Sequence, residues 1–365
     1  MSSKASGERR LGESGGRSDG NVHGQRTSIL EVKGMMGGRD RRGRPQQTLE
    51  RVRRLSRTGA ARLRRCDQPF CRRFGILVYH RVATPLIDPW NLAVTPENFE
   101  GQLASLGGSA TFVRLDAELE RSRLTRIGRS DQRIAITFDD GYADNLHAAL
   151  PILERHDVPA TIFVATAFLD RPNFWWDRLA ALTLSLSAPT TSQAKSTLVG
   201  LELTHDHQRL HEELYGRLVG CEPSAIEDAL DRLSTDLTDI DDLDDARPLS
   251  SDELVELAAH PLISIGAHTS THPHLTWLDR PAARAEILRG NQALDKLIGP
   301  GHRPLAYPYG DAGRSTARIA RDLGFRHAVT TEPSWARSSD GCRLLPRLHP
   351  LDVDGEELLR QLINA

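Results

Sequence analysis

The sequence has no apolar run of about 18 residues or more, the length that crosses a membrane, so no transmembrane helix is expected. The charged N-terminus is not followed by an apolar segment, and no secretory signal is visible. Four cysteines, Cys66, Cys71, Cys221 and Cys342, form no CxxC pair, which favours free thiols in a reducing compartment over a disulfide framework. These absences together predict a cytoplasmic protein.

Residues 1–40 have almost no aromatic side chains and are rich in Gly, Ser and Arg, which is typical of disorder. Residues 1–73 contain 19 Lys and Arg against 7 Asp and Glu, whereas the rest of the chain has 28 against 42. The most basic part, residues 41–73, is interpreted as a solvated tail because its apolar face is thin; the alternative is a peripheral contact with the inner face of an anionic membrane. Nucleic acid is not expected as a partner, because the positive charge of this tail is the only feature of the sequence that would favour it.

From residue 74 onward, short apolar runs alternate with amphipathic segments. The runs predict strands, at 74–80, 111–115, 133–138, 159–166, 261–268, 304–310 and 326–331. The segments predict helices, at 95–107, 143–157 (interrupted by Pro151), 250–260, 279–299, 314–325 and 354–364. Strands alternating with helices imply a parallel sheet that is buried on both faces. So many β/α units favour a closed or nearly closed barrel, with a doubly wound open sheet as the alternative.

Residues 170–249 interrupt the alternation. They begin with NFWWDRLAALTLSL, continue through a polar stretch and end in the acidic run DLTDIDDLDDARP. This stretch is interpreted as a mostly helical insertion, and its acidic run as a solvated face or linker, because the carboxylates lack the spacing of a cation-binding loop. The predicted organisation is therefore a basic extension at 1–73 and a domain at 74–365 that contains the insertion.

Polar side chains stand where four of the predicted strands end. They are His80, the adjacent pair Asp139 and Asp140, His268 with His272 four positions later, and Tyr309 with Gly310. In a parallel barrel the C-terminal ends of the strands gather at one mouth, so these groups are expected to meet.

The stretch HTSTH, residues 268–272, is expected to be a loop, since Pro273 follows it. His268, His272 and one carboxylate would make a set of two histidines and one acid, a common catalytic metal site with open positions. By itself the histidine pair has an equally simple explanation in capping or packing. The acidic pair at another strand end favours the metal site. His274 is interpreted as a packing residue and is the alternative ligand.

Three motifs in this order resemble the polysaccharide deacetylases of the NodB-homology type, carbohydrate esterase family 4. They are TFDDGY at 137–142, HTSTH at 268–272 and AYPYG at 306–310. The early YHRV, residues 79–82, looks like the subgroup that acts on extracellular and cell-envelope polysaccharides. The resemblance extends over about residues 74–353, apart from the insertion. It implies an α/β fold, a distorted (β/α)7 TIM-like barrel.

The resemblance also implies roles for individual residues. Asp140 would bind a divalent metal ion, with zinc the first choice, together with His268 and His272. Asp139 would be the general base for the water that attacks the acetyl carbonyl. The backbone N–H of Tyr309 would stabilise the oxyanion, in a turn sharpened by Pro308 and Gly310.

One position departs from the family pattern. The third motif usually begins with an arginine that orients the general base, and here that position is Ala306. Arg347, in the stretch LPRLHP, is the first candidate to replace it, and Arg81 is the second.

The leaving amine needs a proton from a general acid. The family uses a histidine from a late LxH motif, which His349 in LPRLHP would supply. His80 is the rival candidate and is ranked higher, because it matches the early YH motif. The alternative for both is a histidine that closes a strand with a backbone hydrogen bond.

The candidates for substrate contact are Tyr142, Pro308, Tyr309, Trp175 and Trp176. The two tryptophans begin the insertion and would form a stacking platform for a sugar, or else would anchor the insertion, which is the preferred interpretation for large aromatic residues. The same two alternatives apply to Trp90.

The leading hypothesis is a metal-dependent hydrolase that removes acetyl groups, by N-deacetylation of N-acetylhexosamine units in a polysaccharide or glycan precursor. O-deacetylation uses the same chemistry. A carbohydrate-binding barrel that has lost catalysis is the alternative from a different class, because the motif arginine is missing. An aspartyl phosphatase is disfavoured, since it needs Asp-x-Asp spacing rather than adjacent acids.

Overall fold

The computed structural model describes residues 73–121, 132–186, 207–234, 246–337 and 340–364. The prediction for the basic extension therefore lies outside the described residues except at Arg73, as do Cys66, Cys71 and most of the acidic run. The strands are β1 (Arg73–Tyr79), β2 (Arg81–Val82), β3 (Ala93–Val94), β4 (Thr111–Phe112), β5 (Arg133–Phe138), β6 (Ala160–Val164), β7 (Ile263–Ala267), β8 (Leu305–Ala306), β9 (Ala328–Val329) and β10 (Ala336–Arg337).

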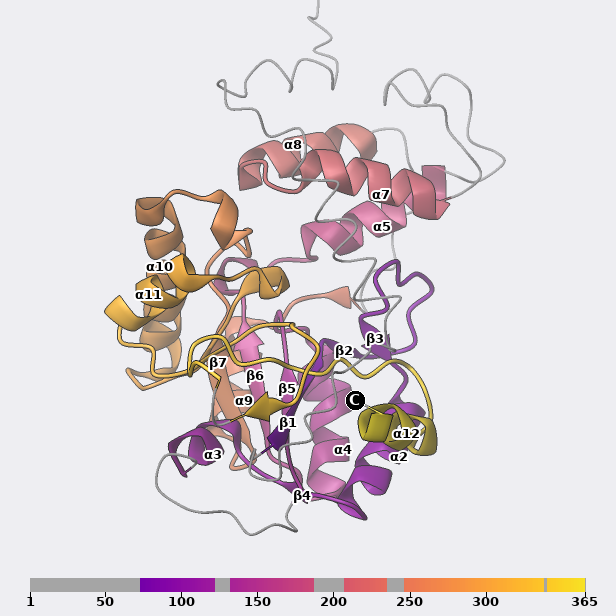
Figure 1. Cartoon of the computed structure of the whole chain (residues 1–365). Coiled ribbons are helices and arrows are strands. Elements are labelled where there is room, and N and C mark those ends of the chain that lie inside the picture. The colour runs from indigo at the N-terminus through magenta and orange to yellow at the C-terminus, as the bar shows by residue number, and fades with distance from the viewer. Residues whose placement is uncertain (1–72, 122–131, 187–206, 235–245, 338–339, 365) are drawn as a thin grey trace, which may run out of the picture.

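The main sheet has parallel strands in the order β1, β5, β6, β7, β8 and β9. Figure 1 shows β1, β5, β6 and β7 side by side. The segment 342–348 joins the two ends of this order. The backbone N–H of Leu345 donates to the carbonyl of Ala328 (3.0 Å), and the N–H of Leu348 donates to the carbonyl of Ile76 (2.9 Å). With this segment as the last member, the described residues form a closed, distorted seven-stranded barrel, as the sequence predicted.

Helices cover the outside of the ring. They are α2 (Pro96–Gly107), α4 (Leu150–Arg155), α9 (Ser251–Ala259), α10 (Arg280–Ile298), α11 (Arg314–Asp322) and α12 (Gly355–Asn364). Helix α3 (Leu115–Arg121) instead packs Leu115 and Leu119 against side chains on the other face of the strands, such as Ile76 and Phe163. Capping contacts confirm the predicted starts of three of these helices. Thr95 caps α2 and Asp279 caps α10, and Ser250 forms a reciprocal capping box with Glu253 in α9. Gly299 ends α10 with a φ of 80°, a conformation that glycine adopts without strain.

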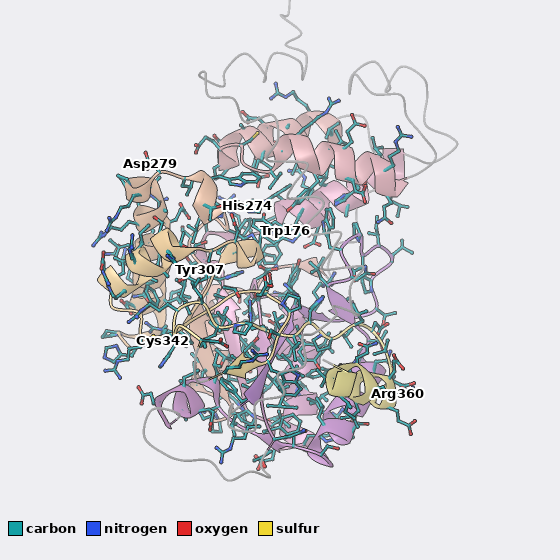
Figure 2. The ribbon with its side chains drawn as sticks, viewed as in Figure 1. Trp176, His274, Asp279, Tyr307, Cys342 and Arg360 are labelled. Carbon is teal, nitrogen blue, oxygen red and sulfur yellow. The ribbon has the colours of Figure 1, made fainter. Side chains whose placement is uncertain are left out.

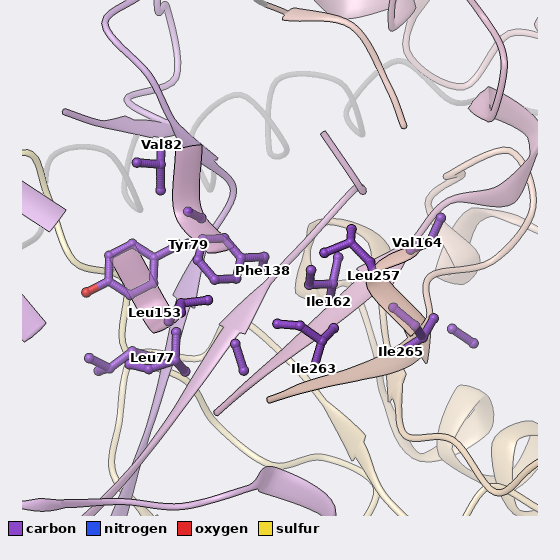
Figure 3. Close-up of a cluster of buried hydrophobic side chains, with 14 of the residues drawn as sticks. Leu77, Tyr79, Val82, Phe138, Leu153, Ile162, Val164, Leu257, Ile263 and Ile265 are labelled. Carbon is purple, nitrogen blue, oxygen red and sulfur yellow. The ribbon is translucent and has the colours of Figure 1, made fainter. Parts of the chain in front are cut away.

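The strands of the ring are mostly apolar because both of their faces are covered. Every residue of β5 and β6 is buried. Figure 3 shows the side chains between the sheet and its helices, with Leu77, Tyr79 and Phe138 in contact with Leu153 of α4. This packing holds the ends of the strands in fixed positions, and the polar groups stand on those ends.

Two predicted elements differ in the structure. The helix expected at 143–157 begins as a wide turn, η2 (Asn145–Ala149), before α4, and Pro151 lies in the first turn of α4, where its missing N–H costs no hydrogen bond. The strand expected at 111–115 is only β4, because Leu115 already begins α3.

Three helices of the described residues fall within 170–249: α5 (Trp175–Leu186), α7 (His207–Leu218) and α8 (Pro223–Ser234). They lie together in a layer above the sheet (Figure 1, top). Their contacts form a separate apolar cluster that includes Leu179, Leu214 and Leu230. No helix in the described ranges is long and apolar enough to cross a membrane.

Candidate active site

The adjacent acids of TFDDGY are turned in different directions by the backbone. Asp139 still continues β5, since its N–H donates to the carbonyl of Tyr79 (3.0 Å). Asp140 has a left-handed φ of 73°, and Gly141 follows with a φ of 88°. A non-glycine residue in this region is uncommon and marks a position that the surrounding structure enforces. The turn sends the Asp140 carboxylate towards the end of β7 and leaves Asp139 inside the barrel.

Asp140 meets His268 and His272 at this point. Its Oδ1 atom lies 3.3 Å from Nε2 of His268 and 3.3 Å from Nε2 of His272. All three residues are buried, and their ligand atoms lie within 4.8 Å of one another. The Oδ1 atom has no hydrogen-bond partner within the described residues, which is costly for a buried carboxylate unless a cation satisfies it. The donor set and this unsatisfied atom therefore fit a divalent metal ion.

The tautomer of His268 also suits a ligand of a divalent metal ion. Its Nδ1 atom lies 2.9 Å from the backbone carbonyl of Ala306, which can only accept, so Nδ1 carries the proton and Nε2 presents its lone pair. Ala306 lacks the side chain of the motif arginine, but its backbone orients a histidine. Burial lowers the pKa of His272 to about 3, which keeps this imidazole in the neutral form that binds metals.

The loop 268–272 is shaped by helix α10. Thr269 and His272 both have left-handed φ values, 65° and 56°. The N–H of His272 donates to Oγ1 of Thr269 (3.2 Å), and the N–H of Thr271 donates to the carboxylate of Glu286 on α10 (2.9 Å). A Cβ atom on Gly290 would lie 2.3 Å from the Thr269 carbonyl oxygen, so α10 packs directly against the loop.

Asp139 is held by Arg347. The guanidinium forms two parallel hydrogen bonds, from Nη1 to Oδ1 (2.7 Å) and from Nη2 to Oδ2 (2.5 Å), and both side chains are almost fully buried. Nε of Arg347 donates to the Thr330 carbonyl (2.8 Å). Burial by itself would raise the pKa of Asp139, but the charges of Arg347 and His268 outweigh it and lower the pKa. The second candidate, Arg81, instead pairs with Asp144 (3.0 Å).

A pocket opens over these groups at the mouth of the barrel. Its lining residues are Val78, His80, Trp90, Leu92, Asp139, Asp140, Trp176, Tyr215, His268, His272, Tyr309, Thr331 and His349. Acids and imidazoles form its floor, and aromatic side chains form part of its wall.

A family model described as polysaccharide deacetylase matches residues 126–328, which is more than half of the chain. The chain belongs to the polysaccharide deacetylase family. YxkH of Bacillus subtilis (strain 168), whose name marks it as a candidate polysaccharide deacetylase, is 23% identical over 276 residues, which are 75% of this chain and 70% of YxkH. The protein is therefore a hydrolase of the polysaccharide deacetylase class.

Solved structures of similar fold agree with the barrel. The deacetylase PplD of Streptococcus pyogenes, in complex with acetate, has a TM-score of 0.53 and 20% identity, with 80% of this chain and 98% of that chain covered. IcaB from Ammonifex degensii has a TM-score of 0.51 and 19% identity, with 80% of this chain and 95% of that chain covered. At these identities the likeness supports the fold alone.

Both general-acid candidates of the deacetylase line the pocket. The rings of His80 and His349 meet edge to face, with centroids 5.5 Å apart. Burial lowers the pKa of both. At His80 the charges of Asp140 and Asp139 oppose this effect and those of Arg347 and His268 add to it. At His349 the charges of His80 and Arg347 add to it and that of Asp139 opposes it, and the pKa falls to about 3. Two carboxylates thus act on His80, and one acts on His349.

The turn of the third motif is strained in the deacetylase. Tyr309 has a left-handed φ of 58° and Gly310 a φ of 61°, and Pro308 is buried. A Cβ atom on Gly310 would lie 2.4 Å from the backbone nitrogen of Thr331, so only glycine fits there. The ring of Tyr309 stacks on His274 with centroids 3.8 Å apart. His274 also contacts Asp311 (3.3 Å) and is not part of the Asp140 cluster.

The structure separates the aromatic candidates for substrate contact. Trp176 lines the pocket, as does Trp90, whereas Trp175 and Tyr142 are not among the lining residues. Trp175 stacks on Tyr215 of α7, with centroids 5.2 Å apart, and so packs within the insertion. The hydroxyl of Tyr142 is bonded to Trp176 and Asp177. Figure 2 shows Trp176 on the side of the helical layer that faces the sheet.

Sequence reasoning missed some residues of the pocket. Tyr215 reaches it from α7, a distant amphipathic helix. Leu92 and Thr331 also line the pocket. Neither stands in a motif, and no spacing in the chain connects Tyr215 to the strand ends. Only the packing of the insertion on the barrel brings it there.

Proposed function

We propose that the protein is a metal-dependent N-deacetylase that acts on N-acetylhexosamine units of a polysaccharide or glycan precursor. The observation that supports this most is the convergence, in one pocket, of the Asp140, His268 and His272 ligand atoms beside a second carboxylate, Asp139, with its own arginine. A carboxylate held ionised next to a cation site can act as general base for a water that attacks an unactivated amide.

Asp140, His268 and His272 would hold the ion, and zinc is the metal that we propose because two imidazoles and one carboxylate are a usual catalytic zinc set. When bound, such an ion supplies Lewis-acid chemistry, lowering the pKa of a water and polarising the acetyl carbonyl.

Asp139 is the proposed general base. Its carboxylate is buried in the pocket floor, and Arg347 keeps it ionised and fixes both of its oxygens. It can therefore accept the proton of the attacking water without changing its position. Arg347 is thus the proposed replacement for the motif arginine that is missing at Ala306. The guanidinium comes from the segment that closes the barrel rather than from position 306.

The remaining roles fall to residues around the pocket. The backbone N–H of Tyr309, in its strained turn, is the proposed donor to the developing oxyanion. His80 is the proposed general acid for the leaving amine, with His349 beside it. Trp176 offers an aromatic face to the substrate at the wall of the pocket.

The test is acetate release from a panel of N-acetylated and O-acetylated glycans. We expect release from an N-acetylated glycan, its loss on treatment with a chelator, and its restoration by Zn²⁺. Asp139→Asn is the matched control, because it keeps the shape and the metal ligands but removes the base. Release from O-acetylated glycans alone would make the protein an O-deacetylase. No release from any glycan, with metal bound, would favour a binding protein.

A further inference from the structure

The two histidines of the Asp140 cluster are held in different ways. His268 is oriented by a hydrogen bond from Nδ1 to the Ala306 carbonyl (2.9 Å). The Nδ1 atom of His272 is buried and has no hydrogen-bond partner within the described ranges. Metal-binding histidines almost always use the second ring nitrogen in a hydrogen bond that fixes the ring. The orientation of His272 therefore depends on something else.

Aromatic rings flank His272 instead. The indole of Trp176 lies at a centroid distance of 5.1 Å and an interplanar angle of 48°. The ring of Tyr309 lies at 4.5 Å and 59°. Both are within the range of favourable aromatic packing, so the imidazole sits between two rings that limit its rotation. Tyr309 is fixed by its own turn, whereas Trp176 comes from α5 in the insertion.

Trp176 is itself held in place by hydrogen bonds. Its Nε1–H donates to the hydroxyl of Tyr142 (2.8 Å), and that hydroxyl donates to Oδ2 of Asp177 (2.8 Å). The indole also stacks on Phe174, with centroids 4.7 Å apart and planes within 16°. Tyr142 is fully buried and belongs to the TFDDGY motif, two residues after Asp140. A continuous set of contacts thus connects the motif that provides one ligand with the ring that packs on another.

We propose that Trp176 is a positioning residue for His272 and that Tyr142 and Asp177 hold its indole in place. The contact of the Trp176 indole with His272 then raises the affinity of the Asp140, His268 and His272 cluster for a divalent ion. The inference rests on the proposed function in one respect, that this cluster binds a metal. It also gives Tyr142 a role different from the expected contact with substrate.

The expected size of the effect follows from how metal sites respond to loss of the groups that orient a ligand. Loss of such a partner typically weakens metal affinity by about 10-fold to 100-fold. Trp176→Ala removes both the packing and the indole N–H, so we expect a loss in this range. Trp176→Phe keeps a ring, and Tyr142→Phe keeps the indole but removes its hydrogen bond. Both should weaken binding by less than Trp176→Ala does.

The experiment measures the Zn²⁺ affinity of the full chain by competition with a chromogenic chelator, with the thermal midpoint measured in parallel. The control is Leu182→Ala, a fully buried position of the same helix within the apolar cluster of the insertion. We expect Leu182→Ala to lower the thermal midpoint, because it weakens the packing of the insertion. We expect the Zn²⁺ affinity to stay within about twofold of the wild type, because this packing does not orient a metal ligand. A Co²⁺-loaded sample gives a second readout, since its absorption spectrum should change in Trp176→Ala and not in the control.

The outcomes separate this inference from the proposed function. If the wild type binds Zn²⁺ and Trp176→Ala and Tyr142→Phe bind it equally well, Trp176 does not position His272. If the wild type itself binds no Zn²⁺, the metal-dependent function fails, and this inference fails with it. If Trp176→Ala does not fold, Tyr142→Phe decides, because it removes a single hydroxyl.

Discussion

Replacing Arg347 by alanine tests the central electrostatic feature of the site. The substitution removes two charge-assisted hydrogen bonds to Asp139, at 2.7 and 2.5 Å, and a third to the Thr330 carbonyl. Both side chains are almost completely buried, so bulk water competes little with the pair. The substitution leaves the carboxylate of Asp139 at the pocket without its charge partner.

The expected loss of stability is large for a single residue. Removing one member of a buried, hydrogen-bonded ion pair costs about 3–5 kcal/mol because the other charge remains uncompensated. This is a large part of the total stability of a typical domain, about 5–15 kcal/mol. The double variant Arg347→Met with Asp139→Asn leaves no unpaired charge and should recover most of the loss. Urea unfolding of the three proteins measures both effects.

The pH dependence should weaken. In the wild type the pKa of Asp139 is lowered, so the ion pair stabilises the fold above the unfolded-state pKa of about 3.9 and is lost as the pH falls through the folded-state pKa. In Arg347→Ala the largest effect that opposes burial is gone, while the charges of His268 and His80 still lower the pKa of Asp139, so this pKa rises from its wild-type position. The stability that this carboxylate contributes above the unfolded-state pKa shrinks accordingly.

Catalysis should follow the same shift. The general base must be ionised, and each unit by which its pKa exceeds the assay pH lowers the active fraction about tenfold. We therefore expect the acidic limb of the kcat/KM profile to move to higher pH in Arg347→Ala. Arg81→Ala is the matched control, since it also breaks a buried arginine–carboxylate pair beside the pocket but leaves Asp139 untouched. Near-normal turnover and an unchanged pH profile in Arg347→Ala would refute the reasoning.

Three further predictions concern the other parts of the site. Asp140→Asn should weaken Zn²⁺ binding by more than about 100-fold, because it removes the only charge of the ligand set; stoichiometric zinc in the purified variant would contradict this. His80→Ala should lower kcat by about 100-fold or more with zinc content intact, and His349→Ala by less, whereas the reverse order would assign the general acid to His349. Gly290→Ala should destabilise the fold by about 1–3 kcal/mol in urea unfolding, because the added methyl would lie 2.3 Å from the Thr269 carbonyl oxygen; an unchanged midpoint would mean that α10 moves away freely.

The predictions from sequence were most successful where the preference of a residue type for a position depends only on its neighbours in the chain. The helices predicted to start at residues 95, 250 and 279 have their caps at Thr95, Ser250 and Asp279, because capping depends on neighbours a few positions away. The ends of elements were less accurate. Apolar runs continue past the last ladder hydrogen bond, so the run at 304–310 contains only the two residues of β8 followed by a tight turn.

Candidate site residues were found from the sequence when they stood at the ends of strands. His80, Asp139, Asp140 and His268 follow directly from the alternation of strands and helices, since parallel strands present their C-terminal ends at one mouth. The sequence also shows that Ala306 stands where the motif has an arginine, and the late stretch LPRLHP points to Arg347 as its replacement. The sequence could not show that its guanidinium forms two hydrogen bonds with Asp139, because the two residues are 208 positions apart.

The sequence by itself determined the family, the kind of barrel and the chemical types of the groups at its mouth, because these depend on local patterns and short motifs. The tertiary structure decided which of the two adjacent acids faces the imidazoles and which faces the arginine, since that follows from the left-handed turn at Asp140. It also decided that Tyr142 packs inside the protein and that Trp176 lies against His272. These outcomes depend on contacts between segments far apart in the chain, which no spacing within a single motif contains.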